Sequence, residues 1–351
     1  KTSEMDVHQI MDSNDLEKER GITIYSKNCS IRYKDYKINI VDTPGHADFS
    51  SEVERIIKTV DTVVLIVDSK EGPMPQTRFV LDKALKQNLN PILFINKIDK
   101  KDARIDDVVN MTFDLFCELG ANEKQLDFPI CYGSARDGIA KYEVEDDNKD
   151  ITPILDTIIK HTSCYEGNEQ DPVQMQISSL AYDDYLGRLG IGRISKGVLK
   201  SGQMVAISKN NGEVVNSRVG KIFVNEGIIR KEVKEARYGE IAIVQTISDI
   251  SIGDTICSPK MGNLTFDGIP TFAPEHFARV RQMDTMKRKQ FIKGISQIAL
   301  EGAIQIFQEF NTGMEEIIVG VVGVLQFDVL KFRLENEYNV EIRLDPLPYE
   351  Y

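Results

Sequence analysis

The sequence predicts three domains in series: an α/β domain, a closed antiparallel β-barrel and a ferredoxin-like α+β domain. Strand-like and helix-like runs alternate over residues 36–161, which is typical of an α/β fold. Short strand-like runs separated by turn signals follow from Val173 onward, without long helices between them. After Leu264 the order is strand, helix, strand, strand, helix, strand. We place the domain boundaries at 1–162, 173–262 and 264–351.

In the first domain, β-branched or aromatic runs mark the strands and amphipathic spacing marks the helices. The expected strands are 37–41, 62–67, 92–95 and 128–132. The expected helices are 52–59, 76–85, 108–119 and 154–161. This alternation predicts a mostly parallel sheet with helices on both faces.

The second domain shows regular short strands and an Asn-Asn-Gly turn at 210–212, which indicates a closed barrel. Its expected strands are 175–180, 190–197, 203–208, 217–223 and 241–245. In the third domain we expect strands at 277–281, 304–308, 316–321 and 340–344 and helices at 286–301 and 325–337. That order is the split βαβ arrangement of a ferredoxin-like domain.

Composition bounds the class of protein. The 351 residues are 41% apolar, enough for cores in two or three domains. No apolar run approaches the roughly 20 residues that cross a bilayer, and no apolar signal segment opens the chain. We therefore expect a cytoplasmic monomer with no membrane partner. Five cysteines without CxxC or CxxH spacing suggest reduced thiols rather than a zinc site. A net charge of −12 argues against non-specific coating of nucleic acid.

The motif Asn-Lys-Ile-Asp begins at Asn96, directly after a strand-like run, where an α/β sheet exposes its carboxyl edge to ligands. A carboxylate at Asp99 can accept from N1–H and the exocyclic amine of guanine, a pair that adenine does not offer. Sites of this type reject the wrong base by about 10⁴-fold or more. We expect Lys97 to lie along the base and Asn96 to tie neighbouring loops together. An ordinary turn is the alternative, and a second expected guanine contact, a backbone N–H at Ser134-Ala135, weakens it.

Asp42 begins a second motif, Asp-Thr-Pro-Gly-His, which also follows a strand-like run. Asp42 can hold Mg²⁺ through water, and Gly45 can bring its N–H against the γ-phosphate because it has no Cβ. Thr23 would add its hydroxyl to Mg²⁺ only in the triphosphate state. His46 would orient the attacking water, behind an apolar gate that includes Ile22. The two motifs together predict a guanine-specific GTPase that uses GTP/GDP and Mg²⁺.

No GxxxxGK[ST] run precedes these motifs. Lys1-Thr2-Ser3 resembles the end of one, but about a dozen residues separate it from Asp12, too few for the intervening helix. We therefore expect an α/β P-loop-type GTPase domain that is incomplete at its N-terminus: either the chain omits residues, or the protein lacks its main phosphate cradle. A Rossmann oxidoreductase is excluded because no GxGxxG opens a βαβ unit.

The third domain contains a basic stretch in an otherwise acidic chain. It sets six cations against the single acid Asp284: Arg279, Arg281, Lys287, Arg288, Lys289 and Lys293. This stretch is either a solvated helix face or a contact with RNA phosphates.

Residues of about 5–260 carry a family resemblance. The motifs are MDSNDLE at 11–17, RGITI at 20–24, DTPGHADF at 42–49, EVER at 52–55, GPMPQTRFV at 72–80, QLDFPI at 125–130, QMQIS at 174–178, YLGR at 185–188 and GIGRI at 190–194. They resemble the ribosome-associated translational GTPases of the TypA/BipA family. The C-terminal part is instead similar to the third domain of peptide chain release factor 3, through GIPTFAPEHF at 268–277, KG at 293–294, EGA at 301–303, VGVVGVLQFDVL at 319–330 and EYNVE at 337–341. The chain thus resembles a composite.

The resemblance implies a ribosome-dependent GTPase that hydrolyses GTP to GDP and phosphate with Mg²⁺. The ribosome would activate His46, and the barrel and C-terminal domain would dock on ribosomal RNA and proteins. Two cellular functions are possible: a TypA/BipA-like role in ribosome assembly and stress adaptation, or ejection of a class I release factor in termination. A ribosome-binding module without hydrolysis is a further alternative, because the phosphate loop is missing.

Overall fold

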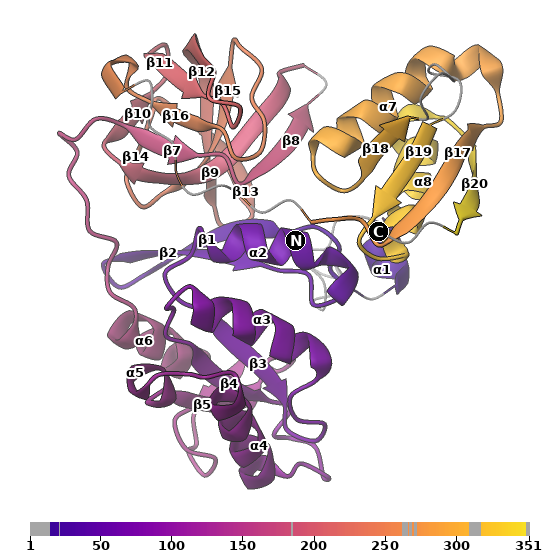
Figure 1. Cartoon of the computed structure of the whole chain (residues 1–351). Helices are drawn as coiled ribbons and strands as arrows, with labels where there is room; N and C mark the ends of the chain where they lie inside the picture. The colour runs from indigo at the N-terminus through magenta and orange to yellow at the C-terminus, as the bar shows by residue number, and fades with distance from the viewer. Residues whose placement is uncertain are drawn as a thin grey trace, which may run out of the picture. The chain divides into compact units, whose positions relative to one another are not determined.

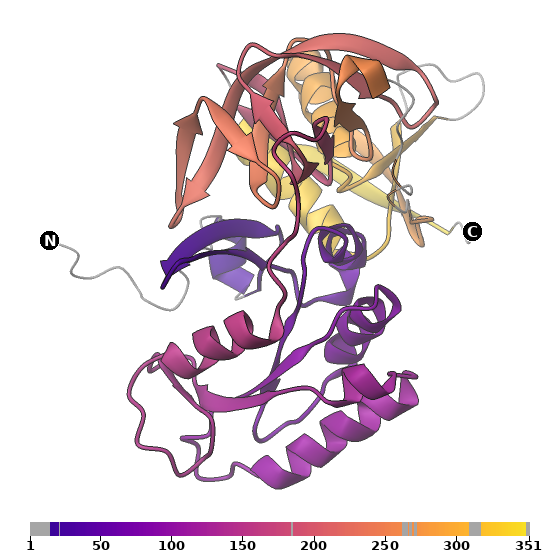
Figure 2. The same ribbon diagram turned by 90° about the vertical axis from the view of Figure 1, so that its left-hand side faces the viewer.

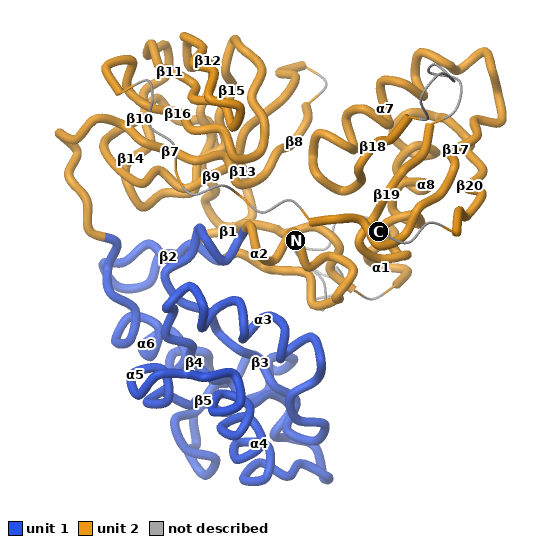
Figure 3. The backbone as a smooth tube through the Cα atoms, viewed as in Figure 1, with its two compact units in different colours: residues 1–12, 31–40, 56–165 blue, residues 13–30, 41–55, 166–351 orange. Residues whose placement is uncertain are grey.

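A computed structural model describes residues 15–20, 22–183, 185–261, 266, 269, 272–308 and 317–348 (Figure 1). These residues form two compact units, each described by itself below. In the described residues, unit 1 comprises 31–40 and 56–165, and unit 2 comprises 15–30, 41–55 and those from 166 onward (Figure 3). The three domain boundaries that the sequence suggests stay a prediction.

Unit 1 is an α/β sheet with helices on both faces. Its strands are β3 (Val64–Asp68), β4 (Ile92–Asn96), β5 (Ile130–Ser134) and β6 (Ile139–Lys141), in the order β3-β4-β5-β6. The first three strands are parallel and β6 is antiparallel. The helices are α3 (Pro75–Lys86), α4 (Ile105–Glu118), α5 (Glu123–Leu126) and α6 (Thr152–His161). Figure 2 shows α4 and α6 on opposite sides of this sheet.

Side-chain alternation explains the two covered faces. Leu65 and Leu93 point into a cluster with residues of α3 and α4, such as Phe116. Phe94, the next residue along β4, points the other way and packs with Ile154 of α6. Since successive strand residues face opposite sides, a strand buried on both faces, such as β4, needs a continuous apolar run. The predicted parallel sheet is confirmed.

The expected strand at 37–41 forms, but its predicted place in the parallel sheet is wrong. It is β2 (Tyr36–Asp42), which pairs with β1 (Lys27–Tyr33) in a separate two-stranded sheet. A two-residue turn with Lys34 at φ 53° joins them. A short turn has a low closure entropy, and β2 is only half-buried, unlike a central parallel strand. The neighbouring helical elements are α1 (Asp15–Arg20), η2 (Ala47–Phe49) and α2 (Ser50–Ile57).

Within unit 2, six strands close into an antiparallel barrel in the order β11-β16-β7-β9-β15-β12 and back to β11. They are β7 (Gln174–Gln176), β9 (Gly187–Lys196), β11 (Met204–Ser208), β12 (Val214–Glu226), β15 (Ile241–Thr246) and β16 (Thr255–Cys257). Attached to them are β8 (Ser179–Asp183) and β13 (Ile229–Val233), and β10 (Val198–Lys200) pairs β14 (Glu235–Arg237). The predicted barrel is confirmed, except that the single expected strand 175–180 is two strands.

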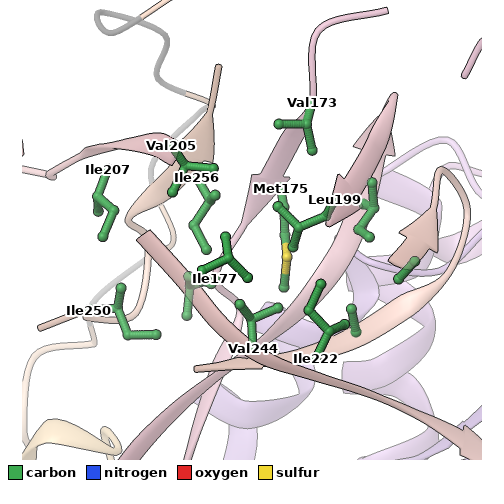
Figure 4. Packing of buried hydrophobic residues seen from close by; sticks show 14 of the residues in the cluster. Val173, Met175, Ile177, Leu199, Val205, Ile207, Ile222, Val244, Ile250 and Ile256 are labelled. Atoms are coloured by element: carbon green, nitrogen blue, oxygen red, sulfur yellow. The ribbon is translucent and has the colours of Figure 1, made fainter. Parts of the chain in front are cut away.

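The barrel interior is filled by aliphatic side chains that converge from several strands (Figure 4). Met175, Ile177 and Ile222 are fully buried there. Such a dry interior excludes water from the backbone ladder and supplies most of the stability of a small barrel.

The third domain, also in unit 2, has the sheet order β18-β19-β17-β20, with antiparallel neighbours throughout. Its strands are β17 (His276–Gln282), β18 (Gln305–Gln308), β19 (Ile317–Val321) and β20 (Ile342–Leu347). Helices α7 (Arg288–Leu300) and α8 (Leu325–Tyr338) share one apolar cluster with this sheet, and the short 3₁₀ segments η3 (Pro259–Met261) and η4 (Thr285–Lys287) precede them. The predicted split βαβ arrangement is confirmed. No helix in the described part of the chain is long and apolar enough to span a membrane.

Removing bulk from the barrel interior should lower the stability of this domain. Ile177→Ala leaves a cavity at a fully buried position, so we expect the free energy of unfolding to fall by about 2–5 kcal/mol. Ile229→Ala is the matched control because Ile229 is 70% exposed on β13, and its effect should stay within about 0.5 kcal/mol. Urea denaturation followed by circular dichroism measures both. Equal losses in the two variants would show that Ile177 is not part of a packed core.

Candidate functional site

Three parallel strands of unit 1 end together at one edge of the sheet. The register pairs Asp68 with Asn96 across β3 and β4, and Asn96 with Gly133 across β4 and β5. Carboxyl ends of parallel strands are where α/β sheets bind ligands. The Asn-Lys-Ile-Asp motif therefore lies at this edge, as the sequence predicts.

The Asn96 amide joins two loops at this edge. Its Oδ1 accepts hydrogen bonds from the N–H of Lys97 and the N–H of Ala135, both at 2.9 Å. Ser69, after β3, donates its N–H to the Asn96 carbonyl and its hydroxyl to the Lys97 carbonyl, both at 2.9 Å. Lys97 adopts the left-handed region at φ 64°, which costs a non-glycine residue about 1–3 kcal/mol. The hydrogen bonds around Lys97 hold this strained turn in place.

Lys97 forms an ion pair with Asp68, whose Oδ2 lies 2.7 Å from Nζ. Burial alone would raise the pKa of Asp68, but the hydrogen bonds from Lys97 and from two backbone N–H groups outweigh it and lower that pKa. The hydrogen bond to Asp68 likewise raises the pKa of Lys97. Both groups stay charged near neutral pH, so Asp68 fixes the Lys97 side chain beside the motif.

Asp68 is a residue that sequence reasoning missed. A signal was available, since Asp68 is the first charged residue after an apolar strand run, as Asn96 is the first polar one after the next. Only the strand register shows that the two are neighbours.

The remaining predicted guanine contacts lie on the loops after β4 and β5. Asp99 is exposed, in the turn that follows β4. Ser134 is buried and donates its hydroxyl to Asp137 Oδ2 at 2.6 Å, which shapes the loop. The Ala135 N–H, expected to meet a base oxygen, is already hydrogen-bonded to Asn96. A base at this position would have to share that donor.

In unit 2, the buried carboxylate of Glu17 organises the segment that contains Thr23. Its Oε1 accepts the N–H groups of Ile24 and Tyr25 at 2.9 and 3.1 Å, and its Oε2 pairs with Lys27 Nζ at 2.5 Å. Because this segment has no regular structure, its backbone donors need such partners. Thr23 directly precedes these two donors and is half-buried. Gly21 of the same motif lies outside the described residues.

Asp42 ends β2 and is half-buried, and Gly45 follows on an exposed turn. A Cβ built on Gly45 would meet no described atom within 4 Å. The protein itself therefore does not require a glycine there, which fits a position that a ligand approaches.

The donor chemistry of Thr23 and Asp42 fits Mg²⁺, which takes one or two protein oxygens and completes its shell with water and phosphate. No group of three or more His, Cys, Asp or Glu side chains in the described residues could hold a metal by itself.

His46 is the N-cap of η2, with an extended backbone at φ −87° and ψ 139°. Its Nδ1 lies 3.3 Å from the backbone N of Asp48 and 3.2 Å from Asp48 Oδ1. The ring stands edge-on to Phe49 at a centroid distance of 6.4 Å, and the side chain is 38% exposed. Phe49 and the proposed gate residue Ile22 belong to one apolar cluster. The imidazole is thus fixed at one nitrogen while part of its surface reaches solvent.

The structure gathers the predicted residues into two sets. Unit 1 brings Asn96, Lys97, Ser134 and Ala135 together through hydrogen bonds and strand pairing, with Asp99 on the adjoining turn. Unit 2 carries the others, which are Thr23, Asp42, Gly45 and His46.

Three family models match the chain. The elongation factor Tu GTP-binding domain matches residues 1–163 and elongation factor Tu domain 2 matches residues 187–257. The C-terminal domain of the class II release factor RF3 matches residues 266–351.

Curated relatives are similar to a large part of the chain. The large ribosomal subunit assembly factor BipA of Bacillus subtilis (strain 168) is 50% identical over 257 residues, 73% of this chain and 42% of that protein. BipA of Salmonella typhimurium is 50% identical over 72% of this chain and 42% of its own length, and BipA of Haemophilus influenzae is 50% identical over 71% and 40%. The chain thus spans about two fifths of the length of these relatives. Over about 250 of its residues the chain is similar to the large ribosomal subunit assembly factor BipA, its residues 1–163 and 187–257 match domains of elongation factor Tu, and its residues 266–351 are similar to the C-terminal domain of RF3.

Proposed function

We propose that this protein is a ribosome-dependent GTPase that hydrolyses GTP to GDP and phosphate. The observation that carries the proposal is the strained Lys97 turn, which the Asn96 amide ties to the Ala135 loop at the carboxyl edge of the sheet. Ile98 in the middle of this turn packs against the apolar core, but Lys97 and Asp99 on either side of it are exposed, so packing does not account for the placement of their charged side chains. Strain of this kind is retained where it positions side chains for a ligand.

In this proposal, guanine lies between the two loops of unit 1. Asp99 accepts from N1–H and the exocyclic amine of the base, and the stem of Lys97 lies along its face. The base O6 shares the Ala135 N–H with Asn96. Adenine offers Asp99 an acceptor in place of a donor and is rejected for that reason.

At the phosphate end, the N–H of Gly45 meets the γ-phosphate, while Thr23 and Asp42 supply oxygen ligands for the metal. Mg²⁺, when bound, neutralises charge that develops on the β- and γ-phosphate oxygens. His46 orients the attacking water, and its contact with Phe49 limits where the ring can point. A single positioned group of this kind is worth about 10²–10³ in rate.

Contact with ribosomal RNA is assigned to the start of α7. Of the six cations in the basic stretch, Arg281 pairs with Asp345 at 2.8 Å, Lys293 lies over the Tyr182 ring at 5.3 Å, and Arg279 and Arg288 also have interactions within the protein. The run Lys287–Lys289 lies at the N-terminus of α7, where the helix dipole disfavours positive charge. These cations therefore do not serve helix stability, and a polyanion is the partner that suits them. Binding to ribosomes also implies a cytoplasmic location, and we propose that the protein acts there as a monomer.

The match of residues 266–351 to RF3 favours a second candidate, ejection of a class I release factor after termination. Termination complexes loaded with a labelled class I release factor distinguish the two. GTP-dependent release of the label supports this candidate, and retention of the label leaves a role like that of BipA. A ribosome-binding module without hydrolysis would release no phosphate from GTP when it is incubated with these complexes.

The first prediction for this function concerns base choice. Asp99→Asn replaces an acceptor by a mixed donor and acceptor, so preference should shift from GTP towards XTP, whose N1–C2 edge is changed in the complementary sense. Competition binding with GTP, XTP and ATP on the full-length protein measures it. Asp102→Asn is the matched control, because Asp102 is exposed and pairs with Lys70. An unchanged preference for GTP in Asp99→Asn would remove Asp99 from the base site.

The second concerns catalysis. His46→Ala should leave GTP binding nearly intact and lower ribosome-stimulated turnover by about 10²–10³-fold, since it removes a group that acts on the transition state. Single-turnover hydrolysis with ribosomes reports the rate. His161→Ala, at the exposed end of α6, controls for the loss of a histidine and should hydrolyse at the parental rate. Parental hydrolysis by His46→Ala would contradict the role in orienting water.

The third concerns ribosome binding. Changing Lys287, Arg288 and Lys289 to Gln should weaken binding and flatten its salt dependence by roughly 0.7–0.9 in the log–log slope per lost phosphate contact. Stability should hardly change, because none of the three side chains is buried and charges near the surface contribute little to folding. Pelleting with ribosomes across a salt series, with a thermal melt, measures both. A triple Gln variant at Lys83, Lys86 and Lys124 of unit 1 is the control. An unaltered slope at the first site would make it a solvated helix face.

A further inference from the structure

The Asp48 carboxylate lies between His46 and the C-terminal domain, and all three belong to unit 2. Its Oδ1 is 3.2 Å from His46 Nδ1. Its Oδ2 accepts the N–H of Leu325, the first residue of α8, at 2.8 Å. The Asp48 side chain is only 16% exposed. The two oxygens of one carboxylate thus join the candidate catalytic histidine to the N-terminus of α8, which begins 277 residues after Asp48.

The C-terminal domain is shaped to receive Asp48. A Cβ added to Gly323 would lie 2.1 Å from Asp48 Cγ, so only glycine permits this approach. The loop that presents Gly323 is itself held, because Gln326 Oε1 accepts the N–H groups of Val322 and Gly323 at 2.8 and 3.2 Å. The Leu325 N–H and the helix dipole at the start of α8 favour a negative charge at this position.

Two groups of Asp48 compete for the same nitrogen of His46. If Nδ1 carries the proton, it donates to Asp48 Oδ1. If Nδ1 is unprotonated, it accepts the Asp48 backbone N–H, whose nitrogen is 3.3 Å away. A neutral imidazole has one protonated nitrogen, so this choice also decides whether Nε2 accepts or donates a hydrogen bond.

While α8 holds the carboxylate in place, we expect His46 Nδ1 to bond to Asp48 Oδ1 and not to the Asp48 backbone N–H. A hydrogen bond to an ionised acceptor is roughly twice as strong as one between neutral groups. Nδ1 then carries the proton, and Nε2 presents a lone pair. If the carboxylate moves away or loses its charge, the backbone N–H takes over and Nε2 becomes a donor.

We propose that Asp48 is a positioning residue that selects the tautomer of His46, and that its contact with α8 makes this selection depend on the docked C-terminal domain. The proposal rests on the proposed function of His46. Asp48 does not touch the water or the nucleotide. It keeps Nε2 as the hydrogen-bond acceptor that a water-orienting imidazole needs. Separation of α8 from Asp48 would change Nε2 from a hydrogen-bond acceptor to a donor. The histidine could then no longer accept a hydrogen bond from water.

The test reads the tautomer directly. The chain has four histidines, so ring ¹⁵N resonances of histidine-labelled protein can be assigned with a His46→Ala variant. At a pH where the ring is neutral, we expect Nε2 of His46 to resonate as an unprotonated nitrogen in the parental protein. Asp48→Asn and Gly323→Ala should each shift it towards a protonated nitrogen. Asn keeps the shape of Asp and can still accept from Leu325, so a purely structural role would leave the resonance unchanged.

Kinetics supply the second readout. Both variants should slow ribosome-stimulated single-turnover hydrolysis by about 10–10²-fold with GTP affinity unchanged, because the imidazole is present in the wrong tautomer. Glu335→Gln is the matched control. It removes a carboxylate from the exposed face of α8, where Glu335 lies 3.9 Å from Lys331, and it should change neither readout. A thermal melt checks that Gly323→Ala folds. Asp48→Asn adds no heavy atom between Asp48 and Gly323, so it tests the selection of the His46 tautomer without the crowding that the added Cβ causes.

The outcomes separate this inference from the proposed function. If His46→Ala slows hydrolysis but neither Asp48→Asn nor Gly323→Ala changes the His46 resonances, the selection by Asp48 is wrong. If the resonances change as expected and His46→Ala hydrolyses at the parental rate, the selection stands and the catalytic role of His46 is wrong.

Discussion

The parallel pairing of β3, β4 and β5 is the constraint on which the geometry of the candidate guanine site depends. It fixes Asp68, Asn96 and Gly133 at one edge, because the register that pairs the apolar runs of the three strands also aligns their carboxyl ends. At that edge the chain leaves the sheet, and its backbone groups lose their ladder partners. Ser69 and the Asn96 amide replace those partners, and the loops that result carry Lys97, Asp99 and Ala135.

In unit 2, carboxylates act as hydrogen-bond acceptors for segments that lack regular secondary structure. The segments around Thr23 and His46 have little regular structure, so Glu17 and Asp48 supply acceptors for their backbone and side-chain donors. Glu52 does the same for Ser26, whose hydroxyl lies 2.6 Å away, and it also pairs with Arg55. Because each of these groups is hydrogen-bonded more than once, their burial does not leave an unpaired charge.

The same segments also meet the C-terminal domain through polar groups. The Arg333 guanidinium of α8 lies over the Tyr25 ring at 5.7 Å and pairs with Glu301 and Glu337. Burial raises the pKa of Tyr25, and the charge of Arg333 only partly opposes it. Polar contacts of this kind can exchange for water when elements separate, which agrees with the proposed function, in which the segment around Thr23 changes between nucleotide states.

Sequence patterns predicted most elements of the fold, and their failures have physical causes. The run 175–180 reads as one strand, yet the chain changes partners at Ile177, which donates its N–H to Asp254, and Ser178, which donates to Ile191. Strand pairing over such separations leaves no local mark. The basic stretch likewise reads as one surface, although Arg281 and Lys293 find partners on a neighbouring strand and on the barrel. Charge alone cannot show which cations are already engaged.

The sequence by itself determined the order and type of the elements and the location of the two nucleotide motifs at strand ends. Periodicity, turn residues and the chemistry of Asn, Lys, Asp and His are local properties, so they can be read along the chain. Only the tertiary structure decided that Asp68 faces Lys97, that the Ala135 N–H bonds to Asn96, and that β2 pairs with β1 outside the parallel sheet. The link from His46 through Asp48 to Leu325 is of the same kind. These contacts depend on strand register and domain packing, which bring together residues that no local pattern relates.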